Sequence, residues 1–304
     1  MGVIPRAVRV DRVAADERAA SFAKRSIKRE SKERGLRLAL SVLDLTTLEG
    51  VDSVEKVRGL CAKAVRPDAG AGGSDLPSCA AVCVYPTLVG VARSALDGMG
   101  ERGRGVAVGR VARVCPGGQS PVEVRLEDPG GAVGAGASEI DMVISRGLFL
   151  AGERGAVYDE IAAVKEACGG AHLKVILETG ELGSYDAVRG ASDLAIAAGA
   201  DFVKTSTGKV QPAATMGVTL VLLESVRDHF DRTGVRIGVK PAGGIRAAKQ
   251  ALAYLVMVKE TVGEAWLDPA LFRIGASSLA DDVVRQLQRL REGSYRAAGD
   301  VSYA

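Results

Sequence analysis

The sequence is short of the residues that several classes of protein require. Aromatic residues make up only 4% of the 304 residues, so a core must be built mainly from Val, Leu, Ile and Ala. No stretch of about 18 apolar residues could span a membrane, and the N-terminus lacks the apolar segment of a signal peptide. The two histidines and five scattered cysteines follow neither zinc-site nor disulfide spacing. We expect a cytoplasmic protein without a metal site.

Neither sign of charge dominates, since 40 Lys and Arg against 37 Asp and Glu give a net charge of +3. Residues 1–34 are nevertheless basic, with ten basic and five acidic side chains. Such an arm could contact nucleic acid or an acidic membrane. It lacks interleaved aromatics and mixes in acids, so a solvated helix over 12–34, packed on the body, is the better interpretation. We predict a basic helical arm over 1–35, with no nucleic-acid or membrane partner.

Beyond the arm, short apolar runs alternate with longer segments of helical spacing. Runs rich in Val and Ile are typical of strands buried on both faces of a parallel sheet. Helical spacing is clearest over 158–168, 218–230 and 246–258. The eight predicted strands are 41–45, 79–85, 105–111, 139–144, 173–177, 202–204, 236–240 and 272–275.

Eight strand–helix units in roughly 260 residues match the size of a (β/α)₈ barrel. A doubly wound open sheet is the alternative, but no Gly-rich dinucleotide-binding motif follows the first strand. We therefore predict an α/β fold, a TIM barrel over residues 36–290. The basic arm forms an N-terminal helical extension, and residues 291–304 form a flexible C-terminal tail.

Lysine is scarce, with 12 residues against 28 arginines, so its positions are informative. Lys204 and Lys240 end the sixth and seventh predicted strands, which are neighbours in a barrel. Burial and a second cation both favour the neutral amine, which Schiff-base formation with a carbonyl requires. Either lysine could instead reach solvent or pair with a carboxylate. The residues alone leave open which of the two would react.

Carboxylates and glycine-rich loops complete the predicted site. Asp141 in the fourth strand could transfer protons or neutralise a lysine, and Glu178 after the fifth strand is a weaker candidate. Barrels often bind phosphate with the loops after strands seven and eight. Here these loops read PAGGIR (241–246) and GASS (275–278). Each alone could be a turn and a helix cap, but both together predict a phosphate site.

At these residues the chain resembles the deoxyribose-phosphate aldolases, class I aldolases with a TIM-barrel fold. The resemblance runs from residue 36 to about residue 290, and the N-terminal arm is similar to that of the longer, eukaryote-type members. Its motifs, in order, are LDLTTLEG (43–50), CVYP (83–86), GASEIDMVI (136–144), LKVILETGEL (173–182), DFVKTSTGK (201–209), VKPAGGIR (239–246) and FRIGASS (272–278).

The resemblance implies reversible cleavage of 2-deoxy-D-ribose 5-phosphate to D-glyceraldehyde 3-phosphate and acetaldehyde in deoxyribonucleotide catabolism, with no metal or other cofactor. It implies that Lys204 forms the Schiff base, that Lys240 is the cation favouring its neutral form, and that Asp141 shuttles protons. Lys174 would hold Asp141 in place. The implied sugar-hydroxyl contacts are Asp44, Thr46 and Thr207, and the implied phosphate contacts are Gly208, Lys209, Gly243, Gly244, Arg246, Gly275, Ser277 and Ser278.

Two segments depart from the family pattern. Cys115 precedes Pro116-Gly117 where the family has an aromatic residue, and residues 128–131 place a proline and two glycines where it has a helix. A break or late start of that helix is expected. We expect the penultimate Tyr303 to pack as part of the tail. Two alternatives remain, a class I aldolase with a different donor or acceptor and a catalytically silent sugar-phosphate-binding protein, and a homo-oligomer is left open.

Overall fold

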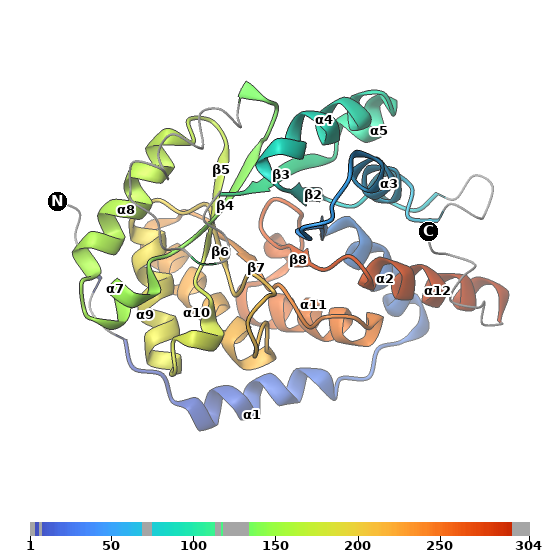
Figure 1. Ribbon diagram of the computed structural model, residues 1–304. Coiled ribbons are helices and arrows are strands. Elements are labelled where there is room, and N and C mark those ends of the chain that lie inside the picture. Colours follow the sequence, from blue (N-terminus) through green and yellow to red (C-terminus); the bar gives the residue numbers. More distant parts are fainter. Residues whose placement is uncertain (1–3, 6–7, 69–74, 113–116, 118–133, 294–304) are drawn as a thin grey trace.

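Eight parallel strands form the barrel in the computed structural model, which describes residues 4–5, 8–68, 75–112, 117 and 134–293 (Figure 1). Hydrogen-bonded neighbours follow the order β7-β6-β5-β4-β3-β2-β1-β8. Backbone bridges from Val239 to Phe272 and from Ala242 to Gly275 join β7 to the β8 segment and close the ring. The predicted TIM barrel is confirmed.

Each observed strand lies within two residues of its predicted bounds. Apolar side chains on both faces keep the strands buried between the barrel interior and the surrounding helices. The strands are β1 (Leu43–Thr46), β2 (Ala81–Val84), β3 (Ala107–Val111), β4 (Glu139–Val143), β5 (His172–Ile176), β6 (Phe202–Lys204), β7 (Gly238–Lys240) and β8 (Ile274–Gly275).

Helices surround the strands, and several begin at side-chain caps. The side chains of Ser53, Ser184 and Thr215 accept hydrogen bonds from backbone N–H groups in the first turns of α3, α9 and α10. The barrel helices are α3 (Val54–Val65), α4 (Val89–Asp97), α5 (Gly100–Arg104), α7 (Arg146–Leu150), α8 (Arg154–Ala167), α9 (Tyr185–Ala197), α10 (Met216–Thr233), α11 (Ala248–Val262) and α12 (Leu279–Glu292), with 3₁₀ turns η1 (Pro86–Leu88), η2 (Thr179–Glu181) and η3 (Glu264–Trp266).

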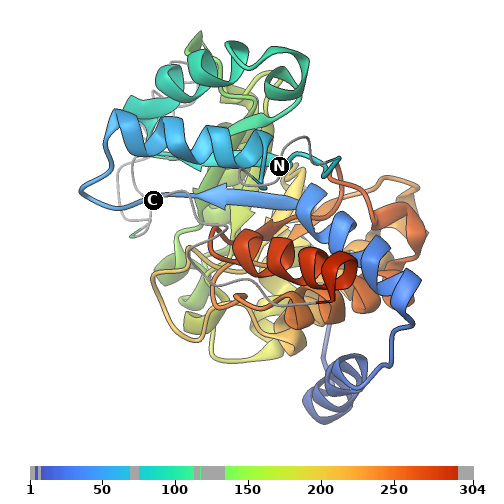
Figure 2. The same ribbon diagram turned by 90° about the vertical axis from the view of Figure 1, so that its right-hand side faces the viewer.

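The N-terminal arm differs from its prediction, because the single helix expected over 12–34 is two helices. α1 (Arg12–Ala23) packs on α10 and α11, whereas α2 (Arg29–Ser41) packs on α11 and α12 (Figures 1 and 2). α2 crosses the predicted boundary at residue 35, since its last turns bury Leu36, Ala39 and Leu40. These apolar residues follow a highly charged segment, residues 24–34, whose composition predicts a solvent-exposed helix. The helical spacing that continues from this segment into the apolar residues was therefore not recognised.

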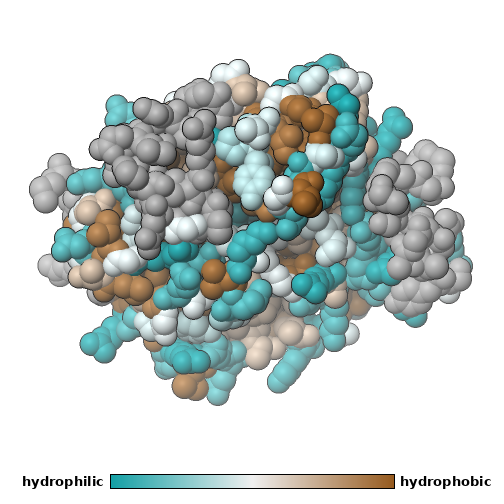
Figure 3. All heavy atoms as spheres, viewed as in Figure 1, coloured by the Kyte–Doolittle hydropathy of each residue, from teal (hydrophilic) through white to brown (hydrophobic). Residues whose placement is uncertain are grey.

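On the face drawn in Figure 3, the coloured residues are a mixture of hydrophilic ones and smaller groups of apolar ones. None of the described helices is long and apolar enough to cross a membrane. Three predictions concern residues outside the described part: the Cys115-Pro116 departure, the helix break over 128–131, and the packing of Tyr303. Residues 291 and 292, which the sequence assigned to the tail, belong to α12.

Candidate active site

The strands bring the predicted catalytic side chains together inside the barrel. Lys204 and Lys240 are direct register partners on β6 and β7. Asp141 on β4 is the register partner of Lys174 on β5. All four side chains are almost fully buried. The structure therefore gathers in one place residues that lie up to 99 positions apart in the chain.

Asp141 is the centre of this arrangement. Its Oδ2 accepts hydrogen bonds from Lys204 Nζ at 2.7 Å and from Lys240 Nζ at 3.0 Å, and its Oδ1 accepts one from Lys174 Nζ at 3.2 Å. Lys240 also donates to Asp44 Oδ2 at 2.5 Å. One carboxylate thus receives hydrogen bonds from three lysines.

Two further charged side chains extend the group. Glu139 Oε2 accepts a 2.5 Å hydrogen bond from Lys174 Nζ, and Glu139 Oε1 accepts one of 2.8 Å from Arg273 Nη2. No member of the group is more than 6% exposed. We call it the buried charge cluster, and its four cations and three carboxylates are Lys174, Lys204, Lys240, Arg273, Asp44, Glu139 and Asp141.

Neither Glu139 nor Arg273 is among the side chains predicted from the sequence. A usable signal was present for Glu139, because residues two apart in a strand share a face and Glu139 is two residues before Asp141. For Arg273, the only signal in the sequence was its position in the predicted eighth strand. Its partner Glu139 is 134 residues away, a distance that no local pattern bridges.

Burial and charge act in opposite directions on the pKa values in the cluster. Burial alone would raise the pKa of Asp141, but Lys174, Lys204 and Lys240 outweigh it and hold that pKa well below its usual range. At Glu139, burial likewise raises the pKa of the carboxyl group, but Lys174 and Arg273 outweigh it and lower that pKa to about 2. Both carboxylates therefore stay ionised at neutral pH.

Burial and a paired cation, taken alone, would lower the pKa of either strand-end lysine, but carboxylates reverse this direction at Lys240, the lysine that the family resemblance makes the cation. Burial does lower the pKa of Lys240, but the carboxylates of Asp141 and Asp44 outweigh it and raise the pKa above its usual value. The pKa of Lys174 is raised for the same reason, with Asp141 and Glu139 as the opposing carboxylates. Lys240 therefore keeps its proton at neutral pH and is a cation beside Lys204.

The glycine-rich loops after β6, β7 and β8 meet above the cluster. Gly208 and Gly243 have φ angles of +86° and +82°, which favour glycine. A Cβ on Gly243 would lie 3.0 Å from the Cα of Gly208 and 2.7 Å from the Cβ of Ala213. The Gly243 N–H donates to the Gly275 carbonyl at 3.3 Å. All three loops predicted to bind phosphate are therefore in direct contact, the loop after β7 touching the other two.

The remaining predicted contacts surround these loops. Ser277 Oγ donates to the Thr46 carbonyl at 2.6 Å and accepts from the Thr46 N–H at 3.0 Å, which ties β1 to the loop after β8. Thr207 Oγ1 donates to the buried carboxylate of Glu178 at 2.6 Å. Lys209 pairs with Glu49 at 3.0 Å. The others, Gly244, Arg246 and Ser278, are exposed.

The comparison with protein families places this architecture. A family model described as DeoC/LacD family aldolase matches residues 38–281. The chain belongs to the DeoC/LacD family of aldolases. It is 47% identical over 289 residues to the deoxyribose-phosphate aldolase of Mus musculus and 46% identical over 291 residues to that of Homo sapiens. In both cases the match covers 92% of this chain and 89% of the relative.

Solved structures agree with this membership of the aldolase family. A tetrameric deoxyribose phosphate aldolase from Aeropyrum pernix aligns with a TM-score of 0.61 at 27% identity, over 91% of this chain and 97% of that one. A protein from Toxoplasma gondii ME49 has the same fold, with a TM-score of 0.75 at 23% identity over 90% of this chain and all of that one. The resemblance seen in the sequence motifs is confirmed.

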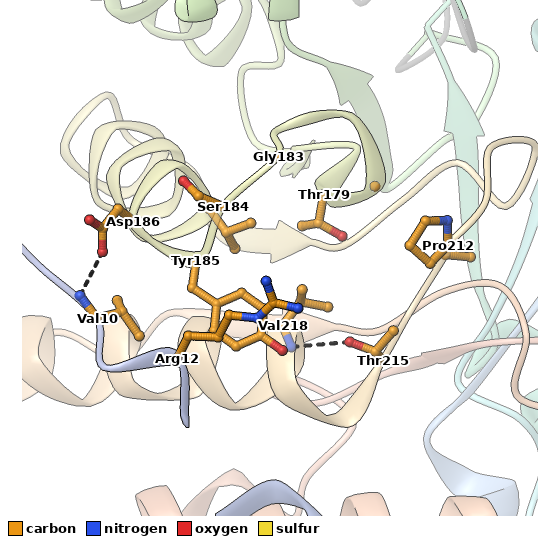
Figure 4. A pocket seen from close by; sticks show the side chains of 13 residues that line it. Val10, Arg12, Thr179, Gly183, Ser184, Tyr185, Asp186, Pro212, Thr215 and Val218 are labelled. Atoms are coloured by element: carbon orange, nitrogen blue, oxygen red, sulfur yellow. Dashed lines mark hydrogen bonds between the residues drawn. The ribbon is translucent and has the colours of Figure 1, made fainter. Parts of the chain in front are cut away.

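A separate cavity of about 480 Å³ lies between the N-terminal arm of this aldolase and the loops after β5 and β6 (Figure 4). Val10, Arg12, Thr179 and Pro212 are among its lining residues. None of the predicted site residues lines it. The hydrogen bond from the Val10 N–H to Asp186 Oδ1, 2.7 Å long, fastens the arm at its edge. This cavity therefore lies at the contact between the N-terminal arm and the barrel, separate from the candidate active site.

Proposed function

We propose that the protein is a class I aldolase that reversibly cleaves 2-deoxy-D-ribose 5-phosphate to D-glyceraldehyde 3-phosphate and acetaldehyde through a Schiff base on Lys204. The names of the mouse and human relatives and the family membership support the reaction. The observation that carries the chemistry is the charge count, four cations against three carboxylates in the buried interior of the barrel. A buried excess charge is costly, so such a cluster favours one neutral amine.

The contacts favour Lys204 as that neutral amine. Lys240 has two carboxylates within 3.0 Å, and Lys174 has two within 3.2 Å. Lys204 makes one carboxylate contact, to Asp141, and shares that oxygen with Lys240. Lys204 is therefore the lysine of the cluster with the fewest carboxylate contacts. Geometry thus supports the choice between the two lysines that the residue types alone left open.

The retro-aldol steps follow from these assignments. The neutral Lys204 amine adds to the C1 aldehyde, and loss of water gives an iminium ion. Asp141, directly or through a water, takes the proton of the C3 hydroxyl while the C2–C3 bond breaks and its electrons enter the iminium as an enamine. D-glyceraldehyde 3-phosphate leaves, C2 of the enamine is protonated, and hydrolysis releases acetaldehyde. The iminium polarises the substrate, so the step requires no metal.

Residues around the cluster would bind the substrate. Asp44 Oδ1 is buried and has no hydrogen-bond partner among the described residues, so it can accept a hydrogen bond from a sugar hydroxyl. Thr46 is the last residue of β1, the strand that carries Asp44, and Thr207 lies in the loop after β6. We assign the phosphate to the loops after β6, β7 and β8. Its contacts there would be Gly208, Lys209, Gly243, Gly244, Arg246, Gly275, Ser277 and Ser278.

We also propose that the protein works in the cytoplasm, in deoxyribonucleotide catabolism. Cys61, Cys79, Cys83 and Cys168 are buried free thiols, which suits a reducing compartment. A homo-oligomer stays a prediction, supported by the tetramer of the Aeropyrum pernix relative.

Turnover of 2-deoxy-D-ribose 5-phosphate, followed by release of D-glyceraldehyde 3-phosphate, tests the proposed function. We expect activity in the wild type and none in Lys204→Leu, which should still bind the phosphorylated sugar. Lys249→Leu, at an exposed position of α11, is the matched control and should keep full activity. Retained turnover in Lys204→Leu would refute the assignment. Cleavage of only other aldol substrates by the wild type would favour a different class I aldolase.

A further inference from the structure

The buried charge cluster extends from the three lysines toward the amino ends of the strands. Glu139 is the first residue of β4, and Arg273 directly precedes β8. Both line a cavity of about 680 Å³ at the amino ends of the strands, opposite the catalytic loops. The side chains of Glu139 and Arg273 therefore separate this cavity from the lysines.

Contacts link this pair to the reacting centre in two steps. Arg273 Nη2 donates to Glu139 Oε1 at 2.8 Å, and Glu139 Oε2 accepts from Lys174 Nζ at 2.5 Å. Lys174 in turn donates to Asp141 Oδ1 at 3.2 Å. Glu139 thus draws Lys174 toward the amino ends of the strands. That leaves Asp141 Oδ2 to Lys204 and Lys240.

We propose that Glu139 and Arg273 are positioning residues of the aldolase site, which hold Lys174 away from full pairing with Asp141 and set the charge balance of the cluster. Neither side chain pairs with Lys204. Glu139 acts through Lys174, and Arg273 acts through Glu139 and through its own charge, which lies 4.0 Å from Asp44 Oδ2. This inference rests on the proposed function, since it concerns the same Schiff-base centre.

The charge balance depends on every titratable or charged group facing the lysines. Cys83 on β2 also faces the cluster, but burial raises the pKa of its thiol to about 12, so it carries no charge at neutral pH. With all three lysines protonated, the cluster therefore carries an excess of one positive charge. The contributing groups are Asp44 on β1, Glu139 and Asp141 on β4, Lys174 on β5, Lys204 on β6, Lys240 on β7 and Arg273 before β8.

Single substitutions of the pair change this excess in opposite directions. Glu139→Gln raises the excess to two positive charges, so a lysine of the cluster gives up its proton at lower pH. Arg273→Met removes the excess, so loss of a proton from a lysine requires higher pH. The double variant restores an excess of one. A purely structural role of the pair would not produce shifts of opposite sign.

The experiment measures kcat/KM against pH for the wild type, both single variants and the double variant. The acidic limb should move to lower pH in Glu139→Gln, to higher pH in Arg273→Met, and back to the wild-type position in the double variant. Because Lys174 then competes for Asp141, kcat of Glu139→Gln should fall about 10- to 100-fold with little change in KM. Glu139→Asp, which keeps the carboxylate, should recover most of the limb position.

Controls separate this inference from loss of folding and from failure of the proposed function. Asp193→Asn breaks a comparable ion pair with Arg189 outside the site and should leave the pH profile unchanged. If a single variant does not fold, the double variant and Glu139→Asp still test the charge balance. An acidic limb that does not move in any folded variant, with an active wild type, overturns the inference alone. A wild type that is inactive and forms no Schiff-base adduct with acetaldehyde on Lys204 overturns the proposed function as well.

Discussion

Replacing Lys240 by methionine removes one cation from the cluster and keeps most of the side-chain volume. Lys204 and Lys240 donate to the same oxygen of Asp141, at 2.7 and 3.0 Å. Their nitrogens are therefore less than about 6 Å apart, and at an effective dielectric constant of about 20 they repel by about 3 kcal/mol. That energy corresponds to about two pH units. The acidic limb of kcat/KM should rise by about two units, with about 100-fold lower activity at pH values on the acidic side of the limb.

The assay is kcat/KM for 2-deoxy-D-ribose 5-phosphate across the pH range in which the variant is folded. Removing Lys240 leaves Asp44 without its closest partner, and breaking a buried pair costs about 3–5 kcal/mol of stability. Thermal unfolding must therefore be measured alongside activity. Lys165→Met is the control, because Lys165 pairs with Asp201 at 2.6 Å away from the cluster. An unmoved acidic limb in folded Lys240→Met would refute the cation argument.

Three further predictions concern the loops, the acid limit of stability and the thiols. Gly243→Ala should raise KM for the phosphorylated substrate, without lowering activity on unphosphorylated 2-deoxyribose, because its Cβ would push against Gly208 and Ala213; equal losses on both substrates would contradict this. The pKa of Glu139 is lowered to about 2, so its stabilising effect is present above pH 4.5 and lost toward pH 2. The melting temperature should fall over that window, and less steeply in Glu139→Gln. Burial raises the pKa of Cys79 and Cys83 to about 12, so iodoacetamide should label these thiols only after unfolding.

The sequence predicted the barrel because each strand is a local signal. Runs such as residues 139–144 are rich in Val and Ile, and the structure places strands within two residues of all eight. The arm was harder, because residues 24–34 are so charged that the apolar spacing of Leu36, Ala39 and Leu40 was not connected to them. Helix boundaries in charged segments depend on packing partners that lie far away in the sequence.

The candidate site could be predicted only in part. Lys204 and Lys240 were recognised because both end predicted strands that are neighbours in a barrel. The carboxylates that keep Lys240 charged could not be identified from the sequence, because the closest one, Asp44, lies 196 residues away and only the closed barrel brings the two together. Arg273 was missed for the same reason, whereas Glu139 carried a local signal in its position two residues before Asp141. Charge balance in a buried cluster is a property of the assembled fold.

The most direct test of the account is to reduce the enzyme with borohydride in the presence of acetaldehyde and to map the modified residue by mass spectrometry. Borohydride converts the transient Schiff base into a stable ethyl group on the reacting lysine. We predict a single ethyl group on Lys204. An adduct on Lys240 alone would keep the class of chemistry and contradict the assignment of roles. The absence of a specific adduct would contradict the Schiff-base mechanism and favour a silent sugar-phosphate-binding protein.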